Sequence, residues 1–168
     1  MKRVEMIIRS PQESDLPSLV EIYNQAIREH KIAITTPVTI KDRGIWFEAR
    51  EAEKHPVLVA ENQGEVLGFL SISPYRPGRD ALRHTALVNY FVHKKHHHQG
   101  VASGLLEKAI TLCPKLEIKN LFAILLENNV ASVKLVQKFG FEKWAHLPRV
   151  AEFEGVEVGQ VYYGKRVN

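Results

Sequence analysis

Cysteine is almost absent from this sequence, since Cys113 is the only one among 168 residues. A single thiol excludes a disulfide within the chain and is typical of a cytoplasmic protein. Long apolar runs are missing as well, because no stretch approaches the roughly 18 residues that a membrane-spanning helix needs. The formal net charge of +4 is too small to indicate nucleic-acid binding. With no repeat or low-complexity linker, we expect one domain spanning residues 1–168, with neither a membrane nor a nucleic acid as its partner.

The hydrophobic pattern alternates between strand and helix periods. Apolar and β-branched runs predict strands at residues 6–9, 56–61, 66–73, 85–92, 121–126, 142–147 and 156–167. Apolar residues at helical spacing, with capping or breaking residues at the ends, predict helices at residues 14–31, 40–53, 101–112 and 131–139. A hairpin followed by strand–helix–strand–helix order implies a mixed α/β sheet.

The junction between residues 85–92 and 101–112 carries the clearest functional signal. A buried strand runs into a loop that ends with Gly100 and the small Ala102, and a helix follows at once. This order aims free backbone N–H groups and the positive end of the helix dipole at one point, which suits a pyrophosphate. Lys94 and Lys95 add positive potential nearby. The same spacing also suits an ordinary tight turn between a strand and a helix.

Four histidines in this loop raise the alternative of a zinc site: His93, His96, His97 and His98. Adjacent side chains in a loop rarely converge on one ion, and no Cys, Asp or Glu lies at a ligand spacing from them. The sequence therefore predicts no metal site.

Short motifs follow one another along nearly the whole chain. They include Ser14-Asp15-Leu16-Pro17, Trp46-Phe47-Glu48-Ala49, Tyr75-Arg76-Pro77, Arg83-His84-Thr85 and Lys138-Phe139-Gly140-Phe141. In content and order they resemble the GNAT superfamily, and within it the phosphinothricin/methionine-sulfoximine N-acetyltransferase-like group. The resemblance implies the GNAT fold, an α/β architecture with a central mixed sheet of about seven strands flanked by about four helices.

The resemblance also implies that the loop binds acetyl-CoA. The family's motif has the form Gln/Arg-x-x-Gly-x-Gly/Ala and corresponds here to His97-His98-Gln99-Gly100-Val101-Ala102, with Ser103 next. Both small residues are present, and the first residue is His. A cradle of backbone N–H groups depends on chain geometry, so we expect it to survive that change.

Other cofactor contacts are implied in the same way. Phe91 and Val92 are placed beside the pantetheine arm, which hydrogen-bonds their backbone like an added strand. Asn129 and Ser132 match the family's Asn-x-x-Ser, whose Asn faces the cofactor. This pair is also a good helix N-cap, and the two roles are compatible.

Departures from the family pattern lie on the acceptor side. Relatives commonly have a glutamate as general base where this chain has Leu87, and often His or Tyr where it has Val136. The relatives' Trp-x-Asp appears here as 157–159, Glu-Val-Gly. His84 and His93 are the nearest candidates for a catalytic proton carrier, because imidazole titrates near neutral pH.

Two functions therefore stay open. The first is an acetyl-CoA-dependent N-acetyltransferase that acts on the amine of a small molecule, such as an amino acid or analogue. The alternative is an acyl-CoA-binding GNAT-like module with weak or no catalysis. The enzyme is favoured, because proximity and carbonyl polarisation can drive acyl transfer without a dedicated base. Relatives often pair through their terminal strands, so the resemblance also implies a homodimer, and Cys113 is expected to be structural.

Overall fold

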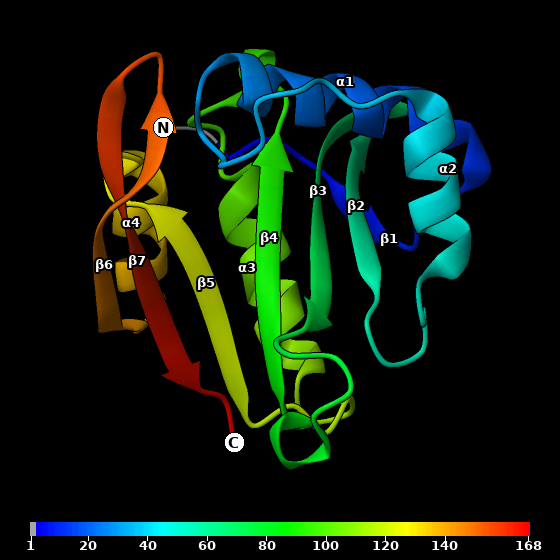
Figure 1. Ribbon diagram of the computed structural model, residues 1–168. Coiled ribbons are helices and arrows are strands. Elements are labelled where there is room, and N and C mark those ends of the chain that lie inside the picture. Colours follow the sequence, from blue (N-terminus) through cyan, green and yellow to red (C-terminus); the bar gives the residue numbers. More distant parts are fainter. Residues whose placement is uncertain (1–2) are drawn as a thin grey trace.

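The computed structural model describes residues 3–168, which form a seven-stranded mixed sheet with helices on both faces (Figure 1). The strand order is β1-β2-β3-β4-β5-β7-β6, in which β4 and β5 pair in parallel and the other neighbours pair antiparallel. The strands are β1 (Ile7–Arg9), β2 (Val57–Asn62), β3 (Glu65–Pro74), β4 (Thr85–Val92), β5 (Asn120–Leu126), β6 (Glu142–Phe153) and β7 (Val156–Arg166). The helices are α1 (Leu16–Arg28), α2 (Ile40–Ala49), α3 (Val101–Leu112) and α4 (Val130–Lys138), with short 3-10 turns at Glu13–Asp15, Asp80–Leu82 and Lys94–His96. This arrangement confirms the predicted fold class.

Helices α1 and α2 end earlier than their sequence patterns predict. α1 ends at Arg28 and α2 at Ala49, before the expected positions 31 and 53. After Ala49 the backbone of Arg50 turns to an extended ψ of 140°. The Arg50 guanidinium donates a hydrogen bond to the Phe47 carbonyl, so this side chain satisfies an acceptor at the helix end.

Strand β6 is longer than predicted and runs to Phe153. Its pairing with β7 shifts register twice, between Lys143 and Ala145 and between Leu147 and Ala151. Such bulges break the period-two alternation on which the sequence prediction rests, so the second half of β6 was missed.

Two separate cores hold the helices to the sheet. α3 and α4 pack on one face, around buried residues that include Leu70, Leu106 and Leu121. α1 packs on the other face with α2 beside it, around a smaller cluster that includes Leu19 and Phe69. No helix within residues 3–168 combines the length and apolar character required to cross a membrane.

Strands β4 and β5 stay paired over three residues of each strand, from Thr85 opposite Asn120 to Leu87 opposite Phe122. Beyond that point they diverge toward their carboxyl ends (Figure 1). β4 continues along β3 and β5 along β7, so each diverging strand presents one free edge to the gap. Backbone N–H and C=O groups on such edges are available to a ligand.

Candidate active site

A cavity of about 1250 Å³ occupies the gap between the diverging strands and extends under α1 and α2. We call its two ends the glycine-loop lobe (Val92, His97, His98 and residues 100–103) and the α1–α2 lobe (Tyr23, Arg43, Trp46, Ser71, Ser73 and Asn89). Both lobes belong to one continuous cavity, so ligands in the two lobes could meet along strand β4.

Gly100 shapes the glycine-loop lobe. It is the N-cap of α3 and has a φ of +83°, a left-handed conformation that favours glycine. The first turn of α3 leaves backbone N–H groups without partners in the helix, and the helix dipole makes this end positive. The lobe is therefore suited to bind phosphate oxygens.

Most of the loop residues singled out in the sequence line the cavity: Phe91, Val92, His97, His98, Gly100, Val101, Ala102 and Ser103. Gln99 does not, because its side chain turns back and donates a hydrogen bond of 3.0 Å to the Lys95 carbonyl. The His97 ring Nε2 lies 2.9 Å from the Val92 carbonyl oxygen, which ties the loop to the end of β4.

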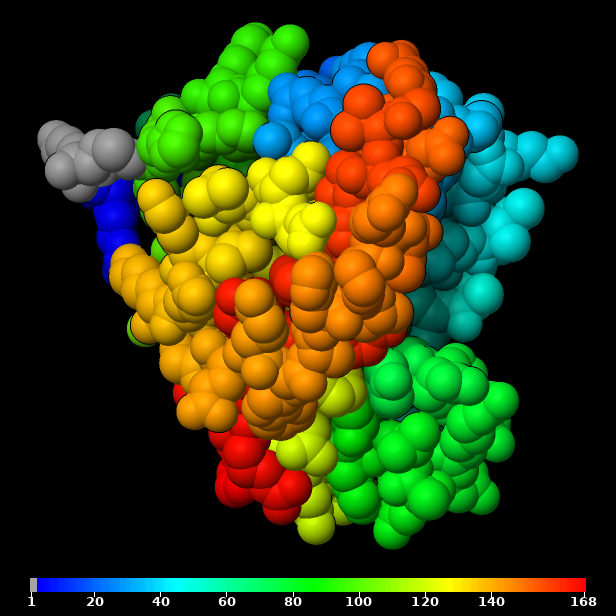
Figure 2. All heavy atoms as spheres, turned by 60° about the vertical axis from the view of Figure 1, so that its left-hand side comes forward, coloured from blue at the N-terminus to red at the C-terminus, as the bar shows by residue number. Residues whose placement is uncertain are grey.

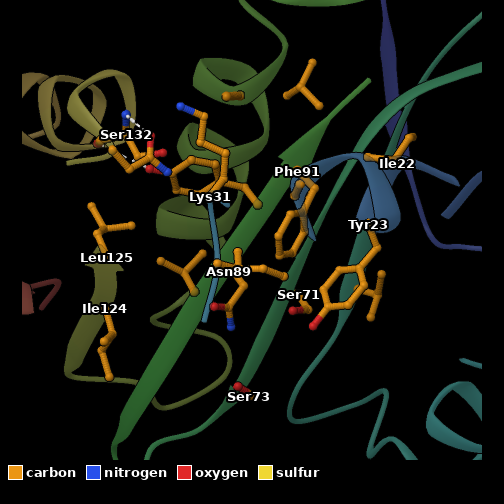
Figure 3. A pocket seen from close by; sticks show the side chains of 18 of the residues that line it. Ile22, Tyr23, Lys31, Ser71, Ser73, Asn89, Phe91, Ile124, Leu125 and Ser132 are labelled. Atoms are coloured by element: carbon orange, nitrogen blue, oxygen red, sulfur yellow. Dashed lines mark hydrogen bonds between the residues drawn. The ribbon is translucent and has the colours of Figure 1, made fainter. Parts of the chain in front are cut away.

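Asn129 and Ser132 line the cavity from the start of α4, where Figure 3 shows Ser132. The Asn129 side chain accepts a hydrogen bond of 3.4 Å from the Ser132 backbone N–H. The pair is therefore an N-cap whose residues also line the cavity.

A row of uncharged polar groups forms the floor of the α1–α2 lobe. Ser71 and Asn89 are register partners on β3 and β4, and Ser73 follows on the same face of β3. Figure 3 shows Ser71, Asn89, Phe91 and Tyr23 gathered around one space. These serines and Asn89 are not among the site residues predicted from the sequence, although period-two alternation places Ser71 and Ser73 on one face of the predicted strand at residues 66–73.

The β6–β7 hairpin closes one side of the molecule beside this cavity. The rings of His30 and Phe153 stack with centroids 4.9 Å apart and an interplanar angle of 18°. Figure 2 shows the end of the hairpin against the helix α1 region. Gln160 of β7 also lines the cavity, so the terminal strands contribute to its wall.

The structure does not bring His84 and His93 to the cavity lining. They flank β4 at its two ends, and nine extended residues span about 30 Å. The His84 Nδ1 lies 2.7 Å from the Glu117 carbonyl oxygen. The His93 Nδ1 accepts a hydrogen bond from the Lys95 backbone, and its Nε2 lies 3.0 Å from Gln25 Nε2. Burial, together with the neighbouring His96 and Lys95 charges, lowers the pKa of His93.

Leu87 and Val136 occupy the two positions at which the family resemblance implies a proton-carrying side chain, and both are apolar. Leu87 lies outside the cavity lining, opposite Ser73 on β3 and Phe122 on β5. Val136 is fully buried in the core. These two positions therefore offer no group that could take or give a proton.

Tyr90 is a proton-bearing group that lines the cavity and is not among the site residues predicted from the sequence. Its hydroxyl lies 3.4 Å from the Ser132 carbonyl oxygen and bridges from β4 toward α4. Burial raises the pKa of Tyr90 to about 12, so the phenol keeps its proton at physiological pH. The sequence feature that could have indicated Tyr90 is a polar-tipped side chain in a strand whose neighbours on the same face, Val88 and Val92, are small and apolar.

The remaining candidates have structural positions. Cys113 is buried, its Sγ donates to the Ala109 carbonyl, and burial raises the pKa of its thiol to about 11. On β7, Tyr163 is buried and Tyr162 is half-buried, because successive side chains of a strand point to opposite faces of the sheet. In the part of the chain that the structure describes, no three His, Cys, Asp or Glu side chains are grouped closely enough to hold a metal ion.

Residues 17–141 match the model of the acetyltransferase (GNAT) family. This chain belongs to that family. An L-amino acid N-acyltransferase from Escherichia coli (strain K12) is 34% identical to it over 86% of this chain and 84% of the relative. The L-methionine sulfoximine/L-methionine sulfone acetyltransferase of Salmonella typhimurium is 32% identical over 92% of this chain and 88% of the relative.

Solved structures of the family share the same architecture. A Salmonella typhimurium protein whose structure includes its cofactor acetyl-CoA matches with a TM-score of 0.92 and 28% identity, over 98% of this chain and 95% of that chain. The seven-stranded mixed sheet with four helices is thus the GNAT fold.

Proposed function

We propose that this chain is an N-acetyltransferase that moves the acetyl group of acetyl-CoA onto the amine of a small molecule, an amino acid or an analogue of one. The observation that carries the proposal is the continuous cavity that joins the glycine-loop lobe to the polar floor of Ser71, Ser73 and Asn89. Relatives named for acetyl transfer to amino-acid analogues, at 32% to 34% identity over most of the chain, support the same reaction.

The residues present fit acetyl-CoA. The free N–H groups at residues 100–103, with the adjoining residues His97 and His98, bind the pyrophosphate. The Gln99 side chain takes no part, because it is bonded to the Lys95 carbonyl. The free edge of β4 at Val92 hydrogen-bonds the pantetheine arm, and Asn129 and Ser132 flank it. Phe91 lines the cavity beside this edge, but its backbone carbonyl faces β3. When bound, acetyl-CoA supplies an acetyl group activated as a thioester.

Proton transfer is assigned to groups inside the cavity. Transfer forms a C–N bond as the thioester C–S bond breaks, so the amine loses a proton and the sulfur gains one. We place the proton for the sulfur on the Tyr90 hydroxyl, whose raised pKa keeps it protonated. Ser71, Ser73 and Asn89 orient the neutral amine and accept hydrogen bonds from it. The proton that the amine loses passes to solvent, from which Tyr90 regains the proton that it gives to the sulfur. His84 and His93 are left out of this route because neither lines the cavity.

The apolar residues Leu87 and Val136 favour a second candidate, an acyl-CoA-binding module with weak or no catalysis. A thiol-release assay with acetyl-CoA and a panel of amino acids, methionine sulfone, methionine sulfoximine, phosphinothricin and polyamines separates the two. The enzyme predicts amine-dependent release of CoA. If no amine of the panel causes CoA release but acetyl-CoA raises the melting temperature, the protein is the acyl-CoA-binding module. If acetyl-CoA does not raise the melting temperature, acetyl-CoA binding itself is refuted.

We further propose that the protein works as a homodimer in the cytoplasm. Trp144 on β6 is 45% exposed and packs edge-on against Phe122 of β5, an aromatic surface on the terminal strands that suits a second copy. The single, buried Cys113 suits a reducing compartment. Light scattering after size exclusion tests the dimer, and a monomer at micromolar concentration would refute it.

A further inference from the structure

Arg43 places a positive charge in the α1–α2 lobe without a visible counter-charge. It lies on α2, lines the cavity, and its guanidinium carbon is 3.8 Å from the centroid of the Tyr23 ring and 4.6 Å from that of Trp46. Stacking on two aromatic faces fixes the plane of the guanidinium and leaves its N–H edge for in-plane hydrogen bonds.

The hydrogen bonds of this guanidinium are incomplete. Within residues 3–168, no carboxylate lies within 4.0 Å of Arg43, and its Nε is buried without a hydrogen-bond partner. Burial lowers the pKa of Arg43, although an arginine stays charged at physiological pH. Arg9, by contrast, pairs with both Asp15 and Glu61. A partly buried cation with an unpaired donor is costly to fold unless a ligand completes it.

The other charged groups of the lobe are engaged or differently placed. Glu51 faces Lys54 and His55 at 3.8 Å and 4.0 Å, and Arg50 donates to the Phe47 carbonyl while stacking on the Phe47 ring. Glu29 and Lys31 line the cavity from the end of α1 and the segment after it. The Nε of Arg50 is also buried without a partner, but the Phe47 carbonyl holds the Arg50 guanidinium. Within residues 3–168, Arg43 has no such hydrogen bond to a backbone carbonyl, and its guanidinium lines the cavity between two aromatic rings.

We propose that Arg43 is a specificity-determining residue that binds the anionic group of the acceptor, so that the enzyme selects amines carrying a carboxylate or a similar oxyanion. This inference rests on the proposed function, because it assigns the acceptor to the α1–α2 lobe. The anion held at Arg43 directs the amine of the acceptor toward Ser71, Ser73 and Asn89, which are uncharged and do not compete for it. Amines without an anionic group, such as polyamines, lose this anchor.

Matched acceptors test the assignment. L-Methionine sulfone and its α-carboxamide differ in the charge of one group, and the wild-type enzyme is expected to prefer the acid. Arg43→Gln should raise KM for the acid by about 10- to 100-fold and leave KM for the amide and for acetyl-CoA nearly unchanged. Arg43→Lys should recover part of the preference, because charge remains while the planar fork is lost. Arg83→Gln removes an exposed arginine outside the cavity lining and should change neither KM.

A binding measurement keeps the inference separate from turnover. Trp46 lies beside Arg43, so in a Trp144→Phe background the remaining tryptophan fluorescence should respond to L-methionine sulfone and not to its amide. Arg43→Gln should abolish that response. Equal responses to acid and amide, no response to either, or an unchanged acid preference in Arg43→Gln would overturn the inference. If no amine causes thiol release, the proposed acetyltransferase activity is refuted. The fluorescence titration does not depend on turnover and still decides whether Arg43 binds the anionic group.

Discussion

The β-carbon that Gly68 lacks would lie 2.6 Å from the backbone carbonyl oxygen of Phe91. Gly68 is on β3 opposite Val92, where β4 borders the cavity. This contact is tighter than van der Waals packing allows, so only glycine lets the two strands approach at this point. The position of the β4 edge therefore depends on a residue outside the cavity.

Gly68→Ala is expected to push Phe91 and Val92 away from β3. The clash is with backbone, which cannot rotate aside, so we expect a loss of about 1–3 kcal/mol in the free energy of unfolding. Affinity for acetyl-CoA should fall as well, because the strand edge moves. Denaturant unfolding and calorimetric titration measure the two effects. Gly44→Ala on α2, where a β-carbon meets nothing within 4 Å, is the control and should not weaken acetyl-CoA binding.

Gly100→Val should remove acetyl-CoA binding. The left-handed φ of +83° costs a residue with a side chain about 1–2 kcal/mol, and relaxing that strain would turn the first N–H groups of α3 away from the cavity. We expect the thermal upshift by acetyl-CoA to disappear. Gly64→Val imposes a similar strain at a φ of +85° in the β2–β3 turn, and it should lower stability while preserving the upshift. If both variants bind acetyl-CoA like the wild type, the glycine loop is not the cofactor site.

The glycine loop could be predicted from the sequence because all of its signals are local. A buried strand, a glycine and a helix start lie within a few residues, and Gly100 takes the conformation that this order requires. The fold class was predictable for a similar reason, since strand and helix periods are visible in short windows. The divergence of β4 and β5 was not, because it depends on where pairing stops between strands far apart in the chain.

The α1–α2 lobe shows the same limit. Arg43 stacks on Tyr23, which is on another helix, and no periodicity in either helix indicates that contact. His84 and His93 lie outside the cavity lining, at opposite ends of β4, and their order in the sequence does not show which side chains border the cavity. The role of Tyr90 could not be predicted from the sequence, because a tyrosine in a strand is typical of a core residue and only the structure shows that its side chain lines a cavity.

Tyr90→Phe should lower kcat by about 100-fold and leave KM for acetyl-CoA nearly unchanged. The ring stays in place, so packing is preserved while the proton assigned to the leaving sulfur is removed. Because the pKa of Tyr90 is raised to about 12, its ionisation should not reduce the wild-type rate below pH 10. Steady-state kinetics across pH checks both statements. Tyr163→Phe, a buried tyrosine outside the cavity lining, should keep the wild-type kcat, and an equal loss in both variants would argue against a catalytic hydroxyl.

Asp15 links the first strand to the start of α1 and should make stability depend on acid. Its carboxylate accepts hydrogen bonds of 2.7 Å and 2.9 Å from Arg9 and one of 2.7 Å from the Gln12 backbone. Arg9 is the main cause that holds the pKa of Asp15 below its usual value. A carboxyl with a folded pKa below its unfolded pKa stabilises the fold above about pH 4, and this contribution is lost as the pH falls through the folded pKa.

Asp15→Asn should therefore cost about 2–3 kcal/mol at pH 7 and flatten the loss of stability below about pH 4. The cost stays below that of a fully isolated buried pair because Arg9 keeps Glu61 as a second partner. Urea unfolding from pH 7 to pH 2 measures both effects. Glu157→Gln breaks the exposed pair with Arg149 and should change stability much less at either pH, because solvent screens that pair. If the stability of Asp15→Asn falls below pH 4 as steeply as that of the wild type, another carboxylate causes the acid sensitivity. Glu61, which is bonded to the same guanidinium, is then the next residue to replace.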